Sequence, residues 1–323
     1  MIDFGPSSPS ARPSLVGSAD AFDELTSPFR RELLVHCYRM LGSIDDAEDA
    51  VQDTFARAWR GRATFQRAIS VRAWMYRIAT NACLDAIERR GRTQGIEAHP
   101  SVGPIPDDVL GDAAAEPEAR YDAHESISLA FLTALQLLPP RQRAVLILRD
   151  VLAWRASEVA ELLELSVPAV NSALHRARTR MSSREEADPV LERLSSAEPH
   201  HLRLLLERYV RAWESADVAG LVALLREEAL VAMPPGVVVR GRDAIAAFLA
   251  ESVFGGGLRL RLIPVRANRG AGFAVYSGGP ADKALRMYAI LLVEVTDSLV
   301  SRISVFADQR LAARFSLADE LPG

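Results

Sequence analysis

Several kinds of residue and segment are scarce in this chain of 323 residues, and each scarcity argues against a class of protein. The only cysteines are Cys37 and Cys83, without a CxxC pair or a histidine at ligand spacing, so we expect neither a disulfide framework nor a metal site. Apolar runs stay shorter than the roughly 18 residues that a transmembrane helix needs. Residues 1–19 lack the basic and apolar regions of a signal peptide and predict a disordered tail. We therefore expect a cytoplasmic protein that does not span a membrane.

An excess of basic residues is also missing. The chain has 38 Lys and Arg against 42 Asp and Glu, with a formal net charge of −4. This balance argues against a uniformly basic surface, so any contact with nucleic acid must be local. With 49% hydrophobic and 25% charged residues, the composition is ordinary for a globular protein, and the length predicts two or three domains.

What is present begins with residues 154–181, which predict a helix-turn-helix. The first helix carries apolar residues at helical spacing, namely Val159, Ala160, Leu162 and Leu163. The turn falls near Glu164–Leu165; Ser166 can cap the second helix, and Pro168 fits its first turn. The apolar stripe of the second helix consists of Val170, Leu174, Ala177 and Met181.

The opposite face of this second helix is polar and basic: Asn171, Ser172, His175, Arg176, Thr179 and Arg180. Acidic residues are absent between Glu164 and Glu185. A basic second helix suits a DNA major groove flanked by phosphates. The alternative is an ordinary helical hairpin whose basic face is merely solvated.

Residues 20–93 predict an all-helical domain, beginning with a helix over 22–41 that Gly42 ends. A second helix starts after the capping residue Ser43, and its outer face is acidic: Glu48, Asp49, Gln52 and Asp53. Such a face either confers solubility or docks a basic partner.

A loop over 61–70 leads to a third helix over 71–90, in which arginines alternate with aromatic residues. We expect Trp74, Ile78, Ala82 and Ile87 in the core. The expected outward residues are Arg72, Tyr76, Arg77, Asn81, Asp85, Arg89 and Arg90. Arginines and aromatics together can follow phosphates and stack on unpaired bases, although helical Trp and Tyr are commonly half-buried core residues.

The remaining chain divides by composition. Residues 94–124 are rich in proline and acids and predict an extended acidic linker; residues 125–184 form a second helical domain, and 185–201 a short connector. From residue 202 to 318, helices (202–215, 217–226, 241–253) and strands (231–240, 258–265, 272–276, 285–295, 300–306) predict an α+β domain. All six histidines lie at or before His201, which argues against a catalytic histidine there. Its candidate pocket groups, expected mostly as caps and rim charges, are Tyr209, Glu214, Asp217, Arg240, Asp243 and Asp308.

Four ordered motifs resemble a bacterial RNA polymerase sigma factor of the extracytoplasmic-function (ECF) group, in the sigma-70 family. They are DAEDAVQDTFARAW (46–59), AWMYRIATNACLDAIERR (73–90), LPPRQRAVLILRDV (138–151) and the helix-turn-helix. Residues 202–318 resemble a SnoaL-like domain, a cone-shaped α+β fold, in the phrases RYVRAWESAD, AMPP and RGRDAIAAFL. The resemblance implies a multidomain architecture of two all-α domains followed by this α+β domain.

The resemblance also implies roles for residues. Those matching the polymerase-docking surface are Asp49, Gln52 and Asp53. Those matching the part that opens the −10 element and flips a base are Phe65, Arg72, Trp74, Tyr76, Arg77 and Asn81. Those matching the −35 reader are Asn171, Ser172, His175 and Arg176, to which Arg178 and Arg180 add charge. The linker matches a segment that threads the polymerase cleft.

The expected function is therefore promoter recognition with core RNA polymerase, without enzymatic activity or a cofactor, and with the SnoaL-like domain regulating it in cis. A small molecule in an apolar cavity of that domain is a further candidate partner. Two alternatives stay open: a ligand-sensing helix-turn-helix regulator, and a SnoaL-like isomerase or hydrolase with a DNA-binding appendage.

Overall fold

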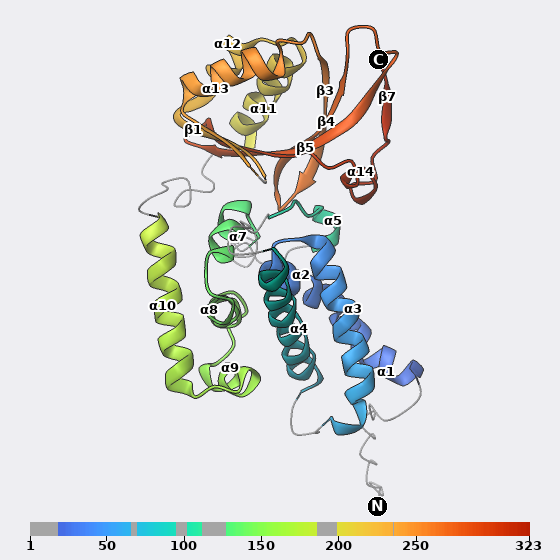
Figure 1. The fold of residues 1–323 in the computed structure, drawn as a ribbon, viewed down its shortest axis with the longest axis vertical. Helices are drawn as coiled ribbons and strands as arrows, with labels where there is room; N and C mark the ends of the chain where they lie inside the picture. Colours follow the sequence, from blue (N-terminus) through green and yellow to red (C-terminus); the bar gives the residue numbers. More distant parts are fainter. Residues whose placement is uncertain (1–18, 66–69, 95–101, 112–126, 186–198, 235) are drawn as a thin grey trace, which may run out of the picture.

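The computed structural model describes residues 19–65, 70–94, 102–111, 127–185, 199–234 and 236–323 (Figure 1). The expected tail up to residue 18, loop residues 66–69, linker residues 95–101 and 112–124, and connector residues 186–198 lie outside the described residues. The first helical domain contains α1 Ala19–Thr26, η1 Ser27–Phe29, α2 Arg30–Leu41, α3 Ile44–Gly61, η2 Arg62–Thr64 and α4 Val71–Gln94.

Two local signals decide where the first helices begin and end. The single helix expected over 22–41 is wrong, because Pro28 lies in a short 3-10 turn that separates α1 from α2. Gly42 ends α2 in the left-handed conformation with φ 76°, as expected. Ser43 then caps α3 by accepting a hydrogen bond from the N–H of Asp46 at 3.4 Å.

The second helical domain contains α7 Leu129–Gln136, α8 Pro140–Leu146, η3 Ile147–Val151, α9 Ala156–Leu163 and α10 Val167–Glu185. The helix-turn-helix forms as predicted: Glu164 adopts φ 55° in the turn, and Ser166 Oγ accepts from the N–H of Ala169 at 3.3 Å. Of the predicted apolar stripe of α10, Val170, Leu174 and Ala177 are buried and Met181 is half-buried.

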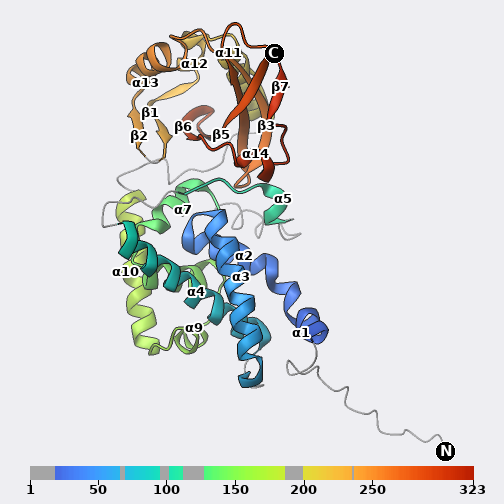
Figure 2. The same ribbon diagram turned by 45° about the vertical axis from the view of Figure 1, so that its right-hand side comes forward.

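The described part of the linker differs from the extended, solvated segment that its acids predicted. Residues 102–111 include the short helix α5 Asp107–Leu110, and Val102, Ile105 and Leu110 are buried. In Figures 1 and 2, α5 lies between the helical domains and the C-terminal sheet. This segment is therefore packed structure that touches both parts of the molecule.

The C-terminal domain is an α+β fold, as predicted. Its elements are α11 Pro199–Glu214, α12 Val218–Val222, β1 Leu225–Met233, β2 Val237–Arg240, α13 Arg242–Phe248, η4 Leu249–Val253, β3 Arg259–Ala267, β4 Gly270–Gly278, β5 Ala284–Thr296, β6 Leu299–Phe306, α14 Leu311–Arg314 and β7 Glu320–Pro322. The sheet has the order β2-β1-β6-β5-β4-β3, with β7 paired to β5 and only β1–β6 parallel among its pairs. The helix expected over 217–226 ends early because β1 begins at Leu225, and the sequence analysis predicted neither α14 nor β7.

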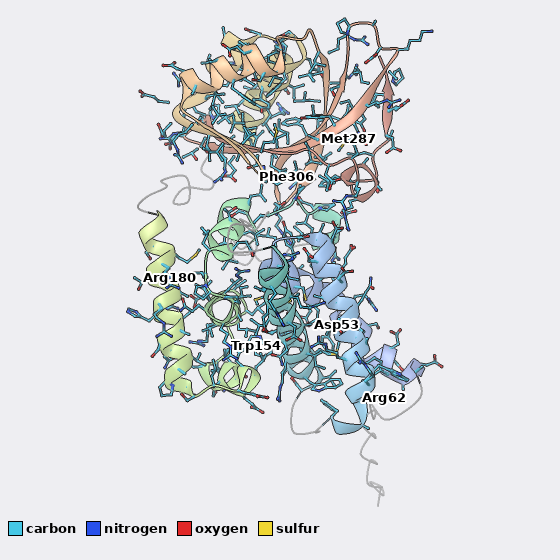
Figure 3. The ribbon with its side chains drawn as sticks, in the orientation of Figure 1. Asp53, Arg62, Trp154, Arg180, Met287 and Phe306 are labelled. Atoms are coloured by element: carbon cyan, nitrogen blue, oxygen red, sulfur yellow. The ribbon has the colours of Figure 1, made fainter. Side chains whose placement is uncertain are left out.

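The two faces of this sheet belong to two different cores. The helices α11–α13 cover one face, where Tyr209, Phe273 and Ile303 lie in one apolar cluster. On the other face Met287 and Phe306 belong to the same continuous cluster as the helical domains (Figure 3). Each such side chain contributes about 1.5–3 kcal/mol when it is fully buried, so the C-terminal domain shares stability with the helical ones. Within the described residues, no helix is long and apolar enough to cross a membrane.

Candidate nucleic-acid interface

The outward face of α10 presents its predicted residues to solvent. Asn171, Ser172, His175 and Arg176 are all exposed, and none of these four side chains bonds to another described residue. Arginine can donate two hydrogen bonds to O6 and N7 of guanine, and asparagine can bond both N6 and N7 of adenine. This part of α10 is therefore free to enter a major groove.

The two remaining predicted arginines of α10 are engaged within their own domain. Arg178 donates to both carboxylate oxygens of Asp150, at 2.9 and 2.7 Å. Arg180 donates to Oε1 of Gln142 at 3.0 Å and is labelled in Figure 3. Both side chains are more than one-third exposed, so they remain near the reading face while also bracing α10.

The corresponding face of α4 is partly covered. Phe65 packs against Trp74 with ring centroids 5.1 Å apart, and both are half-buried. Arg72 forks onto the carboxylate of Glu32 at 2.8–3.1 Å. Arg77 forms an ion pair with Glu164 in the turn before α10. Only Asn81 of this predicted set is exposed without a bond to a described residue.

Tyr76 contradicts the prediction that it faces outward, because only 1% of it is exposed. Its ring lies 5.2 Å from that of Trp154 and 5.1 Å from that of His36. Burial raises the pKa of its phenol above the usual range, with Glu32 nearby adding to the shift. The face of α4 was also misassigned elsewhere: Met75, Ala79 and Cys83 are buried, whereas Trp74, Ile78 and Ile87 are half-buried.

A cleft of about 530 Å³ separates α4 from the start of the helix-turn-helix. One wall carries Arg72 and Arg77, and the other carries Glu158 and Glu161. Glu158 accepts from the backbone N–H of Arg155 at 2.7 Å, and Arg72 binds Glu32 of its own domain. Among the described residues, the ion pair that joins the arginine wall to the helix-turn-helix is therefore Arg77–Glu164.

Arg143 of α8 fastens the two helical domains together. Its buried guanidinium donates to the carbonyls of Met40 in α2, Gln136 and Leu138, and to the side chain of Gln136. Burial lowers its pKa to about 10, so it remains charged at neutral pH. A charged donor that serves several carbonyls fixes the geometry more firmly than apolar packing alone.

The acidic face of α3 keeps Asp49 and Gln52 exposed, as predicted. Asp53 pairs with Arg57 at 2.7 Å, and Arg57 also pairs with Asp85 of α4 at 2.7 Å. The three predicted residues therefore share one face, but one of them is already partly neutralised.

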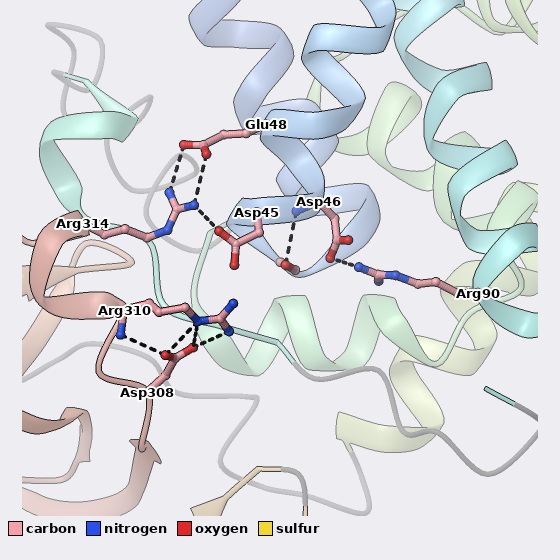
Figure 4. A network of polar contacts seen from close by, with 8 residues as sticks. Asp45, Asp46, Glu48, Arg90, Asp308, Arg310 and Arg314 are labelled. Carbon is pink, nitrogen blue, oxygen red and sulfur yellow. Dashed lines mark hydrogen bonds and ion pairs between the residues drawn. The ribbon is translucent and has the colours of Figure 1, made fainter. Parts of the chain in front are cut away.

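At its N-terminal end, α3 meets the C-terminal domain. Figure 4 shows Arg314 of α14 reaching Asp45 and Glu48, with Nη1 2.9 Å from Oε1 of Glu48. Sequence analysis missed Arg314, because no local pattern tells which arginine meets an acidic helix roughly 270 residues earlier.

The turn between β3 and β4 forms the second junction, which the sequence analysis also missed. Asn268 and Arg269 have φ 52° and 58°, as a two-residue hairpin turn with two left-handed positions requires. The side chain of Asn268 accepts from the N–H of Ile105 at 3.0 Å and donates to Tyr38 Oη at 2.8 Å and to the carbonyl of Ile127 at 3.0 Å. We call this turn with its bonds the Asn268 clamp.

The β3–β4 hairpin also binds one acid of the linker. Asp107 accepts from the backbone N–H of Arg269 at 2.6 Å and pairs with the Arg266 side chain at 3.2 Å. One asparagine thus joins the first helical domain, the linker and the start of the second helical domain. The sequence could have suggested part of the turn, since Asn tolerates the left-handed conformation, but Arg269 gave no such signal and the partners gave none.

Comparisons with known proteins agree with this division. The family described as Sigma-70 region 2 matches residues 25–93, Sigma-70 region 4 matches 128–181, and the SnoaL-like domain matches 206–303. The chain is 38% identical to the ECF RNA polymerase sigma factor SigG of Mycobacterium tuberculosis strain H37Rv, over 93% of this chain and 85% of SigG. It is 32% identical to the ECF sigma factor SigE of Mycolicibacterium smegmatis, over 50% of this chain and 60% of SigE.

Among solved structures, the extracytoplasmic function sigma factor SigJ of Mycobacterium tuberculosis has the same fold. The TM-score is 0.62 at 23% identity, and the match covers 93% of this chain and 100% of SigJ. The likeness extends through the helical domains and the C-terminal sheet.

Proposed function

The chain belongs to the ECF RNA polymerase sigma factors, and from this membership we propose that it binds core RNA polymerase, recognises −35 and −10 promoter elements and starts transcription. The observation that carries the proposal is the order of sigma-70 region 2, sigma-70 region 4 and an exposed recognition helix in one chain. Its place of action is then the cytoplasm, where polymerase and chromosome are.

We assign the promoter contacts to the two predicted faces. In residues 125–184, α10 reads the −35 element through Asn171, Ser172, His175 and Arg176, with Arg178 and Arg180 near the phosphates. In residues 20–93, the −10 element is opened by Phe65, Arg72, Trp74, Arg77 and Asn81, with Tyr76 supporting them from below. Asp49, Gln52 and Asp53 dock on polymerase, and residues 94–124 enter its cleft.

This assignment requires the two helical domains to separate. The −35 and −10 elements are about 25 base pairs apart by name, or roughly 85 Å at 3.4 Å per base pair. The recognition helix α10 has 19 residues, which is about 28 Å, and its domain contacts α4 directly through Arg77–Glu164 and Trp154–Tyr76. The described arrangement is therefore a closed one that cannot reach both elements at once, and polymerase binding must open it.

We further propose that the C-terminal domain, residues 202–318, regulates in cis by favouring the closed arrangement. The Asn268 clamp holds linker residues 102–111 away from any cleft, and Arg314 occupies acids next to the polymerase-docking face. An interaction that exists only in the closed state shifts the population toward that state.

We assign no catalytic activity to this domain. Asp217 caps α12 through the N–H of Gly220 at 2.8 Å, Glu214 accepts from the N–H of Leu262 at 3.1 Å, and Asp308 pairs with Arg310. Tyr209 is fully buried, and burial raises the pKa of its phenol. Such structural roles support a regulatory domain over an enzyme.

The basic test is reconstituted transcription. Core polymerase mixed with the purified chain and a randomised promoter library should yield transcripts from a defined subset of templates. A chain that does not bind core polymerase at all would overturn the proposal.

The test of regulation is Asn268→Gly in the full chain. Glycine keeps the left-handed turn but removes the clamp's side-chain bonds, so we expect transcription to rise several-fold. Truncation before residue 202 is a blunter test, because it also uncovers apolar residues of the shared core. The matched control is Asp297→Gly, at the same place in the left-handed β5–β6 turn (Asp297 φ 51°, Ser298 φ 63°), with no predicted effect on output. Equal output from Asn268→Gly and the parent chain would contradict regulation through the clamp.

A further inference from the structure

A cavity of about 950 Å³ lies where the C-terminal domain meets the second helical domain. It is bounded by one face of α11 and by the β3–β4 hairpin with β5, and it extends to Ser128 and Leu129 at the start of α7. Figures 1 and 2 show α7 beneath this end of the sheet. The volume is at the upper end of the range for small-molecule sites, roughly 300–1,000 Å³.

The inner wall of the cavity is apolar. It is lined by Leu206, Val210, Leu262, Phe273, Val293 and Val295. Its occupant therefore needs an apolar body, since a polar one would lose its hydration without gaining hydrogen bonds there.

The rim of the cavity carries more basic than acidic side chains. Arg203, Arg211, Arg266 and Arg269 line it against Glu207, while the carboxylate oxygens of Glu294, which also lines the cavity, are buried. Three of these arginines have partners. Arg266 pairs with Asp107, Arg269 donates to the carbonyl of Gly111 at 3.1 Å, and Nε of Arg203 lies 3.8 Å from Oε1 of Glu207.

Arg211 differs from these three arginines. Its guanidinium forms neither a hydrogen bond nor an ion pair with any of the described residues. The N-terminus of α7, the positive end of its helix dipole, borders the same cavity through Ser128 and Leu129. The unpaired guanidinium of Arg211 favours a negative charge beside the apolar interior.

We propose that this cavity binds an amphiphilic anion, a carboxylate on an apolar chain or ring system, with its body against α11, the sheet and the start of α7 and its carboxylate at Arg211. This inference deepens the regulation proposed above and rests on it. A molecule that contacts both α11 and α7 binds only when the two domains are together, so it stabilises the closed arrangement and lowers transcription.

Binding is tested by calorimetry on the full chain, with dodecanoate below its micelle concentration as the probe. Acetate supplies the head group alone, and dodecyltrimethylammonium supplies the same tail with the opposite charge. We expect dodecanoate to bind, and both comparison compounds to bind at least about tenfold more weakly, because each lacks one of the two interactions. Equal binding of the cation would overturn the assignment of charge.

Two variants locate the site. Arg211→Glu should weaken dodecanoate at least about tenfold, whereas Arg208→Glu, on the same helix but outside the cavity lining, should leave its affinity unchanged. Val210→Trp should fill the interior and abolish binding. Because Arg211 is exposed, its variant tests the site even if the tryptophan variant does not fold. Unchanged affinity in Arg211→Glu would place the ligand elsewhere and overturn the proposal.

The regulatory part has its own readout. Saturating dodecanoate should lower transcription by the parent chain and have less effect on Arg211→Glu. Binding without any change in transcription would overturn the coupling but leave the site. If the chain supports no transcription even when dodecanoate is absent, the sigma-factor proposal is overturned instead. The calorimetry would then still show whether the cavity binds dodecanoate.

Discussion

The two helices assigned to promoter recognition, α10 and α4, present opposite situations. α10 is exposed along the face that its own sequence predicts, with Asn171 and Arg176 open to solvent. α4 has Tyr76 buried and Arg77 paired with Glu164. The outward face of α10 is accessible in the isolated chain, whereas the face of α4 is partly covered by the domain that contains α10.

This difference indicates an order of events. A recognition helix that is always exposed binds weakly wherever it meets DNA, since phosphate contacts are not sequence-specific. Under the assignment proposed above, the partly covered face of α4 would meet the −10 element only after polymerase has separated the two helical domains. Glu164 contributes charge to this cover through its ion pair with Arg77.

The largest expected effect removes the fastening between the two helical domains. Arg143→Met leaves the carbonyls of Met40 and Leu138 without their donor, which costs about 3 kcal/mol. Urea unfolding should show this loss, and small-angle scattering should show a more extended chain, so that α4 becomes as exposed as α10. Arg141→Met, at an exposed position of the same helix, is the matched control and should change neither measurement. A compact Arg143→Met chain of parental stability would contradict this role.

A smaller effect is expected from the exposed reader itself. Arg176→Glu should lower transcription from the best template of the promoter library roughly 10- to 100-fold, in line with the 1–3 kcal/mol that one base contact contributes. Binding to core polymerase, measured separately, should not change. Arg208→Glu on α11, outside the cavity lining, controls for the change in charge. Parental output and unchanged promoter preference in Arg176→Glu would remove Arg176 from the site.

The free energy of unfolding should depend on pH through the buried contact between α2 and α4. His36 of α2 is fully buried with Nε2 3.0 Å from Thr80 Oγ1 of α4, and burial, with Arg39 nearby, lowers its pKa to about 3 from 6.5. The neutral ring is the folded form, so its stability is fully present above pH 6.5 and is lost as pH falls from 6.5 toward 3. The slope is about 1.4 kcal/mol per pH unit below 6.5.

Urea unfolding of the parent chain at pH 7.5, 6.5 and 5.5 measures this slope. In His36→Gln the part of the slope below pH 6.5 should diminish, since glutamine keeps a polar group toward Thr80 but does not titrate. Identical pH profiles for the two chains would refute the assignment.

The smallest effect concerns the surface contact between α4 and the turn of the helix-turn-helix. Arg77→Gln and Glu164→Gln should each raise the affinity for core polymerase by less than about fivefold, because an exposed ion pair contributes at most about 1 kcal/mol. The double variant should gain no more than either single one. Strictly additive gains would show that the two side chains do not act through each other.

The same contrast explains what sequence reasoning could predict. The helix-turn-helix is specified locally, by the Ser166 cap, the position of Pro168 and an apolar stripe that packs within its own domain, against α8 and α9. α4 packs against α2 and α3 on one side and against Trp154 on the other, and a one-sided helical pattern cannot show a second partner. The acids of residues 102–111 indicated solvent, because a count of charges does not show that Arg266 and a backbone N–H meet Asp107.

The Asn268 clamp also has a consequence in time. Its bonds join residues separated by 141, 163 and 230 positions, and the turn lies downstream of everything it holds. Roughly 80 residues follow α10 before Asn268 is made, which at about 5–20 residues per second is on the order of 4–16 seconds of synthesis. During that interval each new chain holds its two helical domains together through Arg143 and the contacts of α4, without the additional restraint of the Asn268 clamp. The chain is thus least restrained while it is still being synthesised. Core polymerase that binds it at that stage would meet helical domains that the clamp does not yet hold.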